Sequence, residues 1–106
     1  MTEDIKKRTI RSFVLRPGRM TDAQNRAYQT LWNEYGLVYN HRPLDLQKVF
    51  GRQAPVVFEI GFGMGDSLLR QTINEPNFDF IGVEVHKPGV GRLMNEAKKA
   101  GVTNLR

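Results

Sequence analysis

One stretch limits what this chain can fold into: residues 56–60 form a short apolar run, and three glycines follow at alternate positions, Gly61, Gly63 and Gly65. A run rich in Val, Phe and Ile and bounded by glycine is typical of a strand buried on both faces in a parallel sheet. The glycines then form the loop at the carboxyl end of that strand, where open α/β sheets bind ligands. Because glycine has no Cβ and accepts unusual dihedrals, the backbone there can approach a ligand closely. We therefore expect an α/β fold with a binding site at this loop.

The spacing of the glycines bears on which ligand the loop takes. A dinucleotide fingerprint is G-x-G-x-x-G, whereas this loop is G-x-G-x-G, with Asp66 where the fingerprint has its third glycine. Glu59 precedes Gly61 by two residues, so a second carboxylate is expected at the same crevice. Carboxylates disfavour a pyrophosphate and attract a ligand that carries an ammonium group and a sulfonium, as S-adenosylmethionine does. The alternative for Glu59 is a carboxylate that only accepts hydrogen bonds from the loop backbone.

A second strand is expected at residues 79–85, and Glu84 lies near its end, nineteen positions after Gly65. A carboxylate about twenty residues past a glycine turn, at the end of the next strand, can accept hydrogen bonds from ribose hydroxyls. This position favours an adenosine ligand without separating NAD from S-adenosylmethionine, because both carry that ribose. A solvated charge at the strand end is the alternative for Glu84.

These motifs resemble those of the bacterial tRNA (guanine-N7-)-methyltransferases, which use S-adenosylmethionine. The resemblance rests on residues 58–65 and 81–91 and also includes residues 11–16 and 18–21, so it covers nearly the whole chain after its first few residues. It implies a Rossmann-like methyltransferase fold and methyl transfer to N7 of a guanosine in tRNA. Carried over by position, it implies cofactor contacts from the glycine loop and the two strand ends: Glu59, Gly61, Phe62, Gly63, Gly65, Glu84, Val85 and His86.

The length of the chain restricts what it can do alone. The resemblance implies a doubly wound sheet with more strands than these 106 residues supply, since they contain two and the start of a third at residues 102–105. We therefore expect an α/β fold truncated to the first half of that sheet, with no catalytic residue in this chain and the catalytic groups beyond Arg106. Right-handed crossovers give the strand order three, two, one. The first strand then lies at an edge, which favours marginal stability and self-association.

The net charge of +5 is distributed unevenly. Residues 1–55 contain ten Lys or Arg against five Asp or Glu, whereas residues 56–106 contain six of each. The first residues interleave basic side chains with apolar ones, and such a segment can neutralise RNA phosphates. A solvated tail is the alternative. We expect tRNA contacts from this segment, through Lys6, Lys7, Arg8, Arg11, Arg16 and Arg19.

We divide the chain into a basic N-terminal arm (1–20), a helical lead-in and linker (21–55) and the N-terminal half of a cofactor-binding domain (56–106). In the lead-in, Thr21 and Gln24 have the spacing of a capping box, and Gly36 is expected to end the helix. For its apolar face we favour packing onto the sheet over stacking on a base. The face consists of Tyr28, Leu31, Trp32 and Tyr35.

Three further helices are expected. Asp45 would cap a short one that runs to Phe50, a second would run from Asp66 or Ser67 to about Ile73, and a third would span residues 88–100. The third would end at Gly101 and turn Leu93, Met94 and Ala97 inward.

Several classes of protein and site are disfavoured. The chain has no cysteine, so it has no disulfide or thiolate metal site, and its two histidines lack the spacing of a metal site. It also lacks an apolar run of roughly 20 residues, as a membrane span requires, and a secretory signal. We expect a cytoplasmic protein. Besides the methyltransferase, two hypotheses stay open: a non-enzymatic module that binds adenosine ligands or RNA or completes another chain, and a dinucleotide-binding domain.

Overall fold

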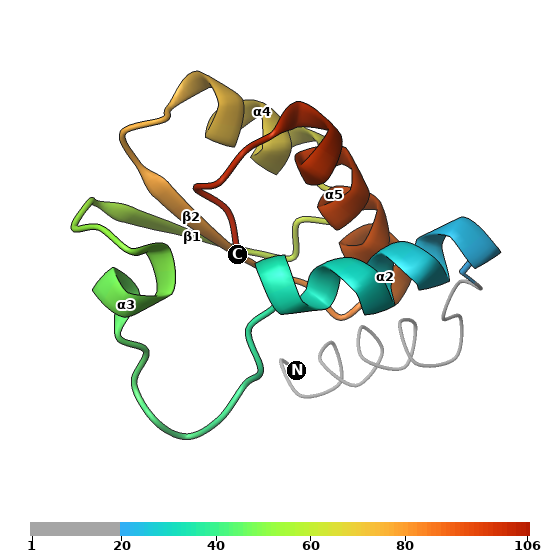
Figure 1. Ribbon diagram of the computed structural model, residues 1–106, viewed down its shortest axis with the longest axis horizontal. Helices are drawn as coiled ribbons and strands as arrows, with labels where there is room; N and C mark the ends of the chain where they lie inside the picture. The colour runs from blue at the N-terminus through green and yellow to red at the C-terminus, as the bar shows by residue number, and fades with distance from the viewer. Residues whose placement is uncertain (1–19) are drawn as a thin grey trace, which may run out of the picture.

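The computed structural model describes residues 20–106, apart from the side chains of Gln24 and Ala27. The residues of the basic N-terminal arm up to Arg19 lie outside this range. The elements run in the order α2 (Asp22–Tyr35), α3 (Leu46–Phe50), β1 (Val56–Ile60), α4 (Asp66–Asn74), β2 (Asp79–Val83) and α5 (Lys87–Ala100). In Figure 1, α4 and α5 lie on one side of the two strands, α2 runs beside α5, and α3 lies apart from these helices. The described part is a small α/β domain, as expected.

The two strands are parallel and in register from Val56 opposite Asp79 to Ile60 opposite Val83. A parallel bridge between Phe80 and Leu105 starts a third strand on the other side of β2. The amide of Phe80 donates to the carbonyl oxygen of Asn104 at 2.8 Å, and the amide of Arg106 donates to that of Phe80 at 3.0 Å. The predicted order three, two, one is therefore confirmed, and β1 is the edge of the described sheet.

One hydrophobic core lies between the strands and the helices. Phe80 of β2 and Leu68 of α4 are 2% and 0% exposed, and Val57 of β1 packs against them from the same face of the sheet. Helix α2 packs mainly against α5. The apolar face of α2 also contributes to this core, because Tyr35 is one of its buried residues and Tyr28, Leu31 and Trp32 pack against it, so the expected core packing is confirmed. The buried core consists of Tyr35, Leu68, Phe80, Leu93, Met94, Ala97 and Leu105.

The opposite face of β1 is exposed. Phe58 and Ile60 alternate with Val57 along the strand, and they are 55% and 81% exposed. The expectation of a strand buried on both faces was therefore wrong for the described residues. None of the described residues pairs with the outer edge of β1. None of them fully covers the face of β1 that carries Phe58 and Ile60.

The predicted helix ends follow from local capping. Asp45 precedes α3, and its Oδ1 accepts a hydrogen bond from the Lys48 amide at 3.3 Å. Gly101 ends α5 in the left-handed conformation, with φ 73°. Gly36 follows α2, and a Cβ there would lie 2.1 Å from the indole of Trp32, so the ring itself requires glycine at that position.

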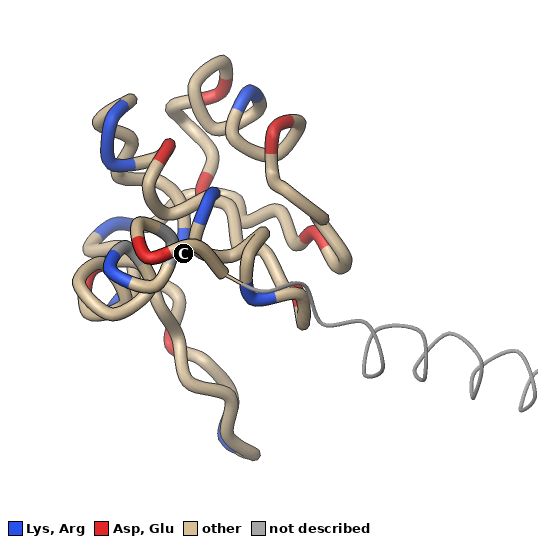
Figure 2. Tube along the Cα trace, turned by 90° about the vertical axis from the view of Figure 1, so that its right-hand side faces the viewer, with Lys and Arg blue, Asp and Glu red and all other residues tan. Residues whose placement is uncertain are grey.

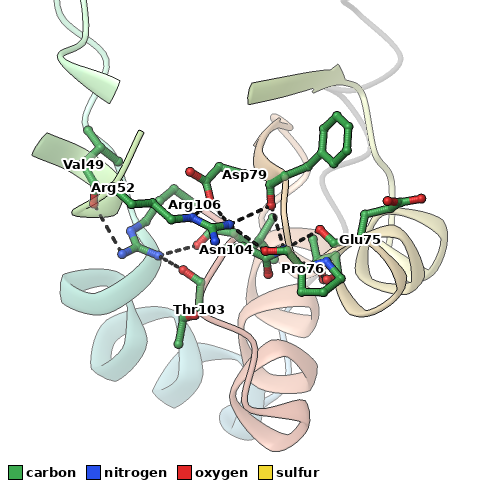
Figure 3. Close-up of polar contacts among 11 residues, drawn as sticks. Val49, Arg52, Glu75, Pro76, Asp79, Thr103, Asn104 and Arg106 are labelled. Carbon is green, nitrogen blue, oxygen red and sulfur yellow. Dashed lines mark hydrogen bonds and ion pairs between the residues drawn. The ribbon is translucent and has the colours of Figure 1, made fainter. Parts of the chain in front are cut away.

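Arg52 ties the linker before β1 to the start of β2 (Figure 3). Its Nε and Nη2 donate to Oδ1 of Asp79 at 3.1 and 2.7 Å, and Nη2 also donates to the carbonyl oxygens of Pro76 and Phe78. Only 2% of the Asp79 side chain is exposed. The hydrogen bond from Arg52 to this carboxylate raises the pKa of Arg52. The contact fixes the end of the sheet that lies away from the glycine loop.

Asn104 supports the same end of the sheet. Its Nδ2 lies within hydrogen-bonding distance of the carbonyl oxygens of Thr72, Glu75 and Phe78, at 3.1, 3.2 and 2.9 Å. Asn104 is buried, so its amide satisfies carbonyl groups at the end of α4 and in the turn that follows. Neither Arg52 nor Asn104 carries a local sequence signal that predicts this role.

Candidate functional site

The glycine loop follows β1 at its carboxyl end. Gly61, Gly63 and Gly65 have φ values of 76°, 67° and 88°, in the left-handed region that favours glycine. A Cβ at Gly61 or Gly63 would have no atom within 4 Å, so both positions face open space. A Cβ at Gly65 would lie 2.9 Å from Cδ1 of Leu93. The first two glycines therefore leave room for a ligand, and the third allows α4 to begin against α5.

Glu84 connects the second strand to this loop. Its Oε1 accepts a hydrogen bond from the Gly63 amide at 2.7 Å, and its Oε2 accepts from the amides of Val85 and His86, both at 3.0 Å. β2 ends at Val83, earlier than predicted, because the next residues turn around this carboxylate. Glu84 is thus bonded to the loop backbone and is not simply a solvated charge.

The first turn of α5 also contacts Gly63, at its carbonyl group. A Cβ at Gly89 would lie 2.0 Å from the carbonyl oxygen of Gly63. Gly89 is buried, so backbone packs directly on backbone here. Gly63 is therefore contacted at its N–H by Glu84 and at its C=O by Gly89.

Glu59 lies elsewhere in the site. It is half-buried on the face of β1 that looks toward α4, and its Oε1 accepts a hydrogen bond from Nε2 of Gln71 at 3.4 Å. The backbone-capping role that we considered for Glu59 is performed by Glu84.

A cavity of about 590 Å³ lies beside Glu84. Its size falls within the range of roughly 300–1,000 Å³ that is typical of small-molecule sites. Phe62, Val83 and Glu84 line it from the loop and β2, and Trp32 and Tyr28 line it from α2. The rings of Trp32 and Tyr28 are stacked, with centroids 5.3 Å apart. As expected from their helical spacing, these rings pack against the core, and they also form a wall of the cavity.

The predicted cofactor residues do not all share this cavity. Phe62 and Glu84 line it, whereas Glu59 and the three glycines do not. Val85 is 72% exposed, and His86 is the N-cap residue of α5, without a capping hydrogen bond from its side chain. The predicted RNA contacts lie outside the described residues, and they are Lys6, Lys7, Arg8, Arg11, Arg16 and Arg19.

Charges of both signs are interspersed over the described part of the chain (Figure 2). Residues 20–106 contain ten Lys or Arg and nine Asp or Glu. The expectation of RNA contacts therefore depends on the basic residues before Met20. Among residues 20–106, no three His, Cys, Asp or Glu side chains are grouped as a metal site would require. None of the helices in that range combines the length and apolarity needed to cross a bilayer.

Comparison with known proteins supplies the family. Residues 53–106, which include the glycine loop, Glu59 and Glu84, match a family model described as "Putative methyltransferase". The chain is 54% identical over 106 residues to a tRNA (guanine-N(7)-)-methyltransferase of Saccharophagus degradans, an alignment that covers 100% of this chain and 46% of the relative. Relatives of the same name from Shewanella oneidensis and Aeromonas hydrophila are 58% and 56% identical over 99 residues, which are 93% of this chain and 42% of each relative. The chain thus spans less than half the length of these relatives. Because the family model matches residues 53–106, which are half of the chain, the chain belongs to the methyltransferase family that this model describes.

Proposed function

We propose that this chain is the cofactor-binding portion of a tRNA (guanine-N7-)-methyltransferase, which transfers a methyl group from S-adenosylmethionine to N7 of a guanosine in tRNA. The observation that carries the proposal is the contact of Glu84 with the Gly63 amide at 2.7 Å, beside two open glycine positions and a ligand-sized cavity. Relatives that bear this enzyme name share 54–58% identity with the chain. In this proposal residues 56–106 are the cofactor-binding half, residues 21–55 the lead-in, and residues 1–20 an RNA-binding arm.

The described residues fit the cofactor. Glu84 accepts three backbone hydrogen bonds, and a carboxylate has about four acceptor sites, so one remains for a ribose hydroxyl. Phe62, Val83 and Trp32 offer an apolar wall for the adenine ring. The open positions at Gly61 and Gly63 leave space for the methionine part. In this assignment Glu59 holds the ammonium group, directly or through water, and Val85 and His86 contact the adenosine part.

The residues of this chain would bind and orient the cofactor without acting on a proton. Guanine N7 has a free lone pair, so its attack on a methyl group needs no general base. The rate would come from holding N7 and the methyl carbon in line, in a cavity that excludes water. S-adenosylmethionine, when bound, supplies the methyl group on a sulfonium. A carboxylate in contact with that sulfur would stabilise the charged ground state, so Glu59 and Glu84 serve best at the ammonium and ribose groups.

The catalytic groups belong, in this proposal, to the part of the relatives that this chain does not cover. The chain alone would bind the cofactor without turnover. The basic residues Lys6 to Arg19 would bind tRNA phosphates, with an affinity that falls as salt rises. A tRNA substrate would place the protein in the cytoplasm.

The outer edge of β1 is a proposed site of self-association. Pro55 accepts a hydrogen bond from the Asp79 amide at 2.9 Å, and Gly61 donates to Val83 at 2.7 Å. By alternation, the backbone groups of Val56, Phe58 and Ile60 point away from β2. An edge with unpaired backbone groups and exposed apolar side chains favours pairing with a second chain.

A chimeric enzyme tests the proposed function. The matching segment of the Saccharophagus degradans relative would be replaced by these 106 residues, and methyl transfer to unmodified tRNA would be measured. We expect N7-methylguanosine in the product, and a strong loss of activity in the same chimera with Glu84→Ala. A folded chimera that binds S-adenosylmethionine but does not methylate tRNA would contradict the proposal. Turnover by the 106 residues alone would contradict the claim that they lack catalytic groups.

A further inference from the structure

We infer that the segment from Gly82 to Gly89 is a rigid template that sets the conformation of the glycine loop, and that Glu84 is a positioning residue as well as a ribose contact. This inference rests on the proposed ligand site. Its consequence is that Glu84 also controls the affinity for ligands that have no ribose hydroxyls.

The loop touches this segment at four points, one of which is the hydrogen bond from the Gly61 amide to the carbonyl oxygen of Val83 at 2.7 Å. A Cβ at Gly82 would lie 2.7 Å from Cδ2 of Phe62, so the phenyl ring rests directly on the backbone of β2. Glu84 accepts the hydrogen bond from the Gly63 amide. The carbonyl oxygen of Gly63 abuts Gly89 in the first turn of α5. Three consecutive loop residues, Gly61, Phe62 and Gly63, are therefore held by contacts from one continuous stretch of eight residues.

Glu84 keeps that stretch in shape at the same time. Its second oxygen accepts hydrogen bonds from the amides of Val85 and His86, the two residues that join β2 to α5. The side chain of His86, the N-cap residue, makes no capping hydrogen bond of its own. One carboxylate thus links the end of β2, the start of α5 and the loop.

The loop needs such support because its glycines restrict the backbone less than other residues would. Gly61 and Gly63 are both in the left-handed region and have open space where a side chain would be. Glycine has access to many backbone conformations, so ordering it costs more entropy than ordering other residues. If the template holds the loop in advance, the ligand does not have to supply that ordering.

Ligands with and without ribose hydroxyls separate the two roles of Glu84. S-adenosylhomocysteine and its 2′,3′-dideoxy analogue would be titrated calorimetrically into the wild-type chain, Glu84→Ala and the control Glu96→Ala, which removes a carboxylate on α5 that pairs with Lys99. We expect Glu84→Ala to weaken both ligands by about tenfold or more, because hydrogen bonds to a charged group are lost. Glu96→Ala should leave both affinities unchanged. An unchanged affinity of the dideoxy analogue in Glu84→Ala would reduce Glu84 to a ribose contact and overturn the inference.

Hydrogen exchange at the Gly63 amide tests the template without any ligand. In Glu84→Ala this amide should exchange about tenfold faster or more, while amides in the core of α5 keep their protection. Gly89→Ala should displace the loop and weaken both ligands similarly, with the far-ultraviolet circular dichroism unchanged. Unaltered exchange at Gly63 in a folded Glu84→Ala chain contradicts the inference. If the wild type binds neither ligand, the proposed function fails, whereas the exchange result still decides whether the template exists.

Discussion

The hydroxyl of Tyr35 donates a hydrogen bond to the carbonyl oxygen of Val102 at 3.0 Å, across 67 positions of sequence. Tyr35 is the last residue of α2, and Val102 follows α5 at the approach to the third strand. Tyr35 is 4% exposed and belongs to the same core as Phe80 and Leu68. The helix α2 is therefore joined to the same hydrophobic core as the strands and α5.

The stability of the chain should depend on pH through Tyr35. Burial, and secondarily the neighbouring Glu34, raise the pKa of the Tyr35 phenol above its ordinary value of 10.0. Because the folded pKa is raised, the stabilisation is complete below about pH 10 and is lost as the pH rises through the folded pKa. Tyr35→Phe should be less stable than wild type by about 1 kcal/mol near neutral pH. The difference should shrink above pH 10 in urea unfolding curves. A difference that stays constant to higher pH would contradict this prediction, and Tyr39→Phe, at a residue 83% exposed, is the control.

The substitution Leu68→Ala should leave a large fraction of the molecules unfolded. Leu68 is fully buried beneath β2, and removing such a side chain from a core costs about 2–5 kcal/mol, a large part of the total stability of a small domain. Val38→Ala, at a residue 71% exposed, should change stability by no more than about 0.5 kcal/mol. Thermal melts followed by circular dichroism test the pair. Similar melting temperatures for Leu68→Ala and Val38→Ala would contradict the core described above.

Arg52→Ala should lower the melting temperature more than Arg92→Ala. Arg52 donates to a buried carboxylate and to two backbone carbonyl groups, whereas Arg92 pairs with Asp66, whose side chain is 64% exposed. Exposed ion pairs contribute little to stability. Arg52→Lys should not restore wild-type stability, because an ammonium cannot reproduce the fork of the guanidinium. Equal effects of Arg52→Ala and Arg92→Ala in the same buffer would disprove the role assigned to Arg52.

Ile60→Lys should reduce self-association. Ile60 is 81% exposed next to the open edge of β1, and a charge beside an edge strand disfavours pairing with another chain. Ile73→Lys is the matched control, since Ile73 is a 52% exposed isoleucine on α4 and not on β1. In sedimentation velocity, wild type and Ile73→Lys should contain associated species that Ile60→Lys lacks. A wild-type chain that sediments as a monomer and melts cooperatively would refute the proposed association.

The elements themselves could be predicted because their signals are local. Asp45, Gly36 and Gly101 mark helix ends through contacts within a few residues, and the strands were recognisable as short apolar runs between turns. The position of the glycine loop at the carboxyl end of β1 followed from the same local pattern.

Long-range contacts could not be predicted in the same way. The bond between Arg52 and Asp79 joins residues 27 positions apart, and that between Gly63 and Glu84 joins residues 21 apart. The spacing pointed to Glu84 as a ligand contact, but the bond of its carboxylate to the loop backbone depends on how β2 meets α5. The exposure of Phe58 depends on which chain segments lie beside β1, and residue composition does not contain that information.

The proposed S-adenosylmethionine site is tested most directly by comparing S-adenosylhomocysteine and NAD as ligands of the ¹⁵N-labelled chain. S-adenosylhomocysteine should shift the amide signals of Gly61, Gly63 and Gly65 and bind at least about tenfold more tightly than NAD, because the carboxylates attract an ammonium group and disfavour a pyrophosphate. Glu84→Ala should weaken both ligands. Tighter binding of NAD would contradict the proposed S-adenosylmethionine site. Binding of S-adenosylhomocysteine that leaves the three glycine signals unmoved would contradict it as well.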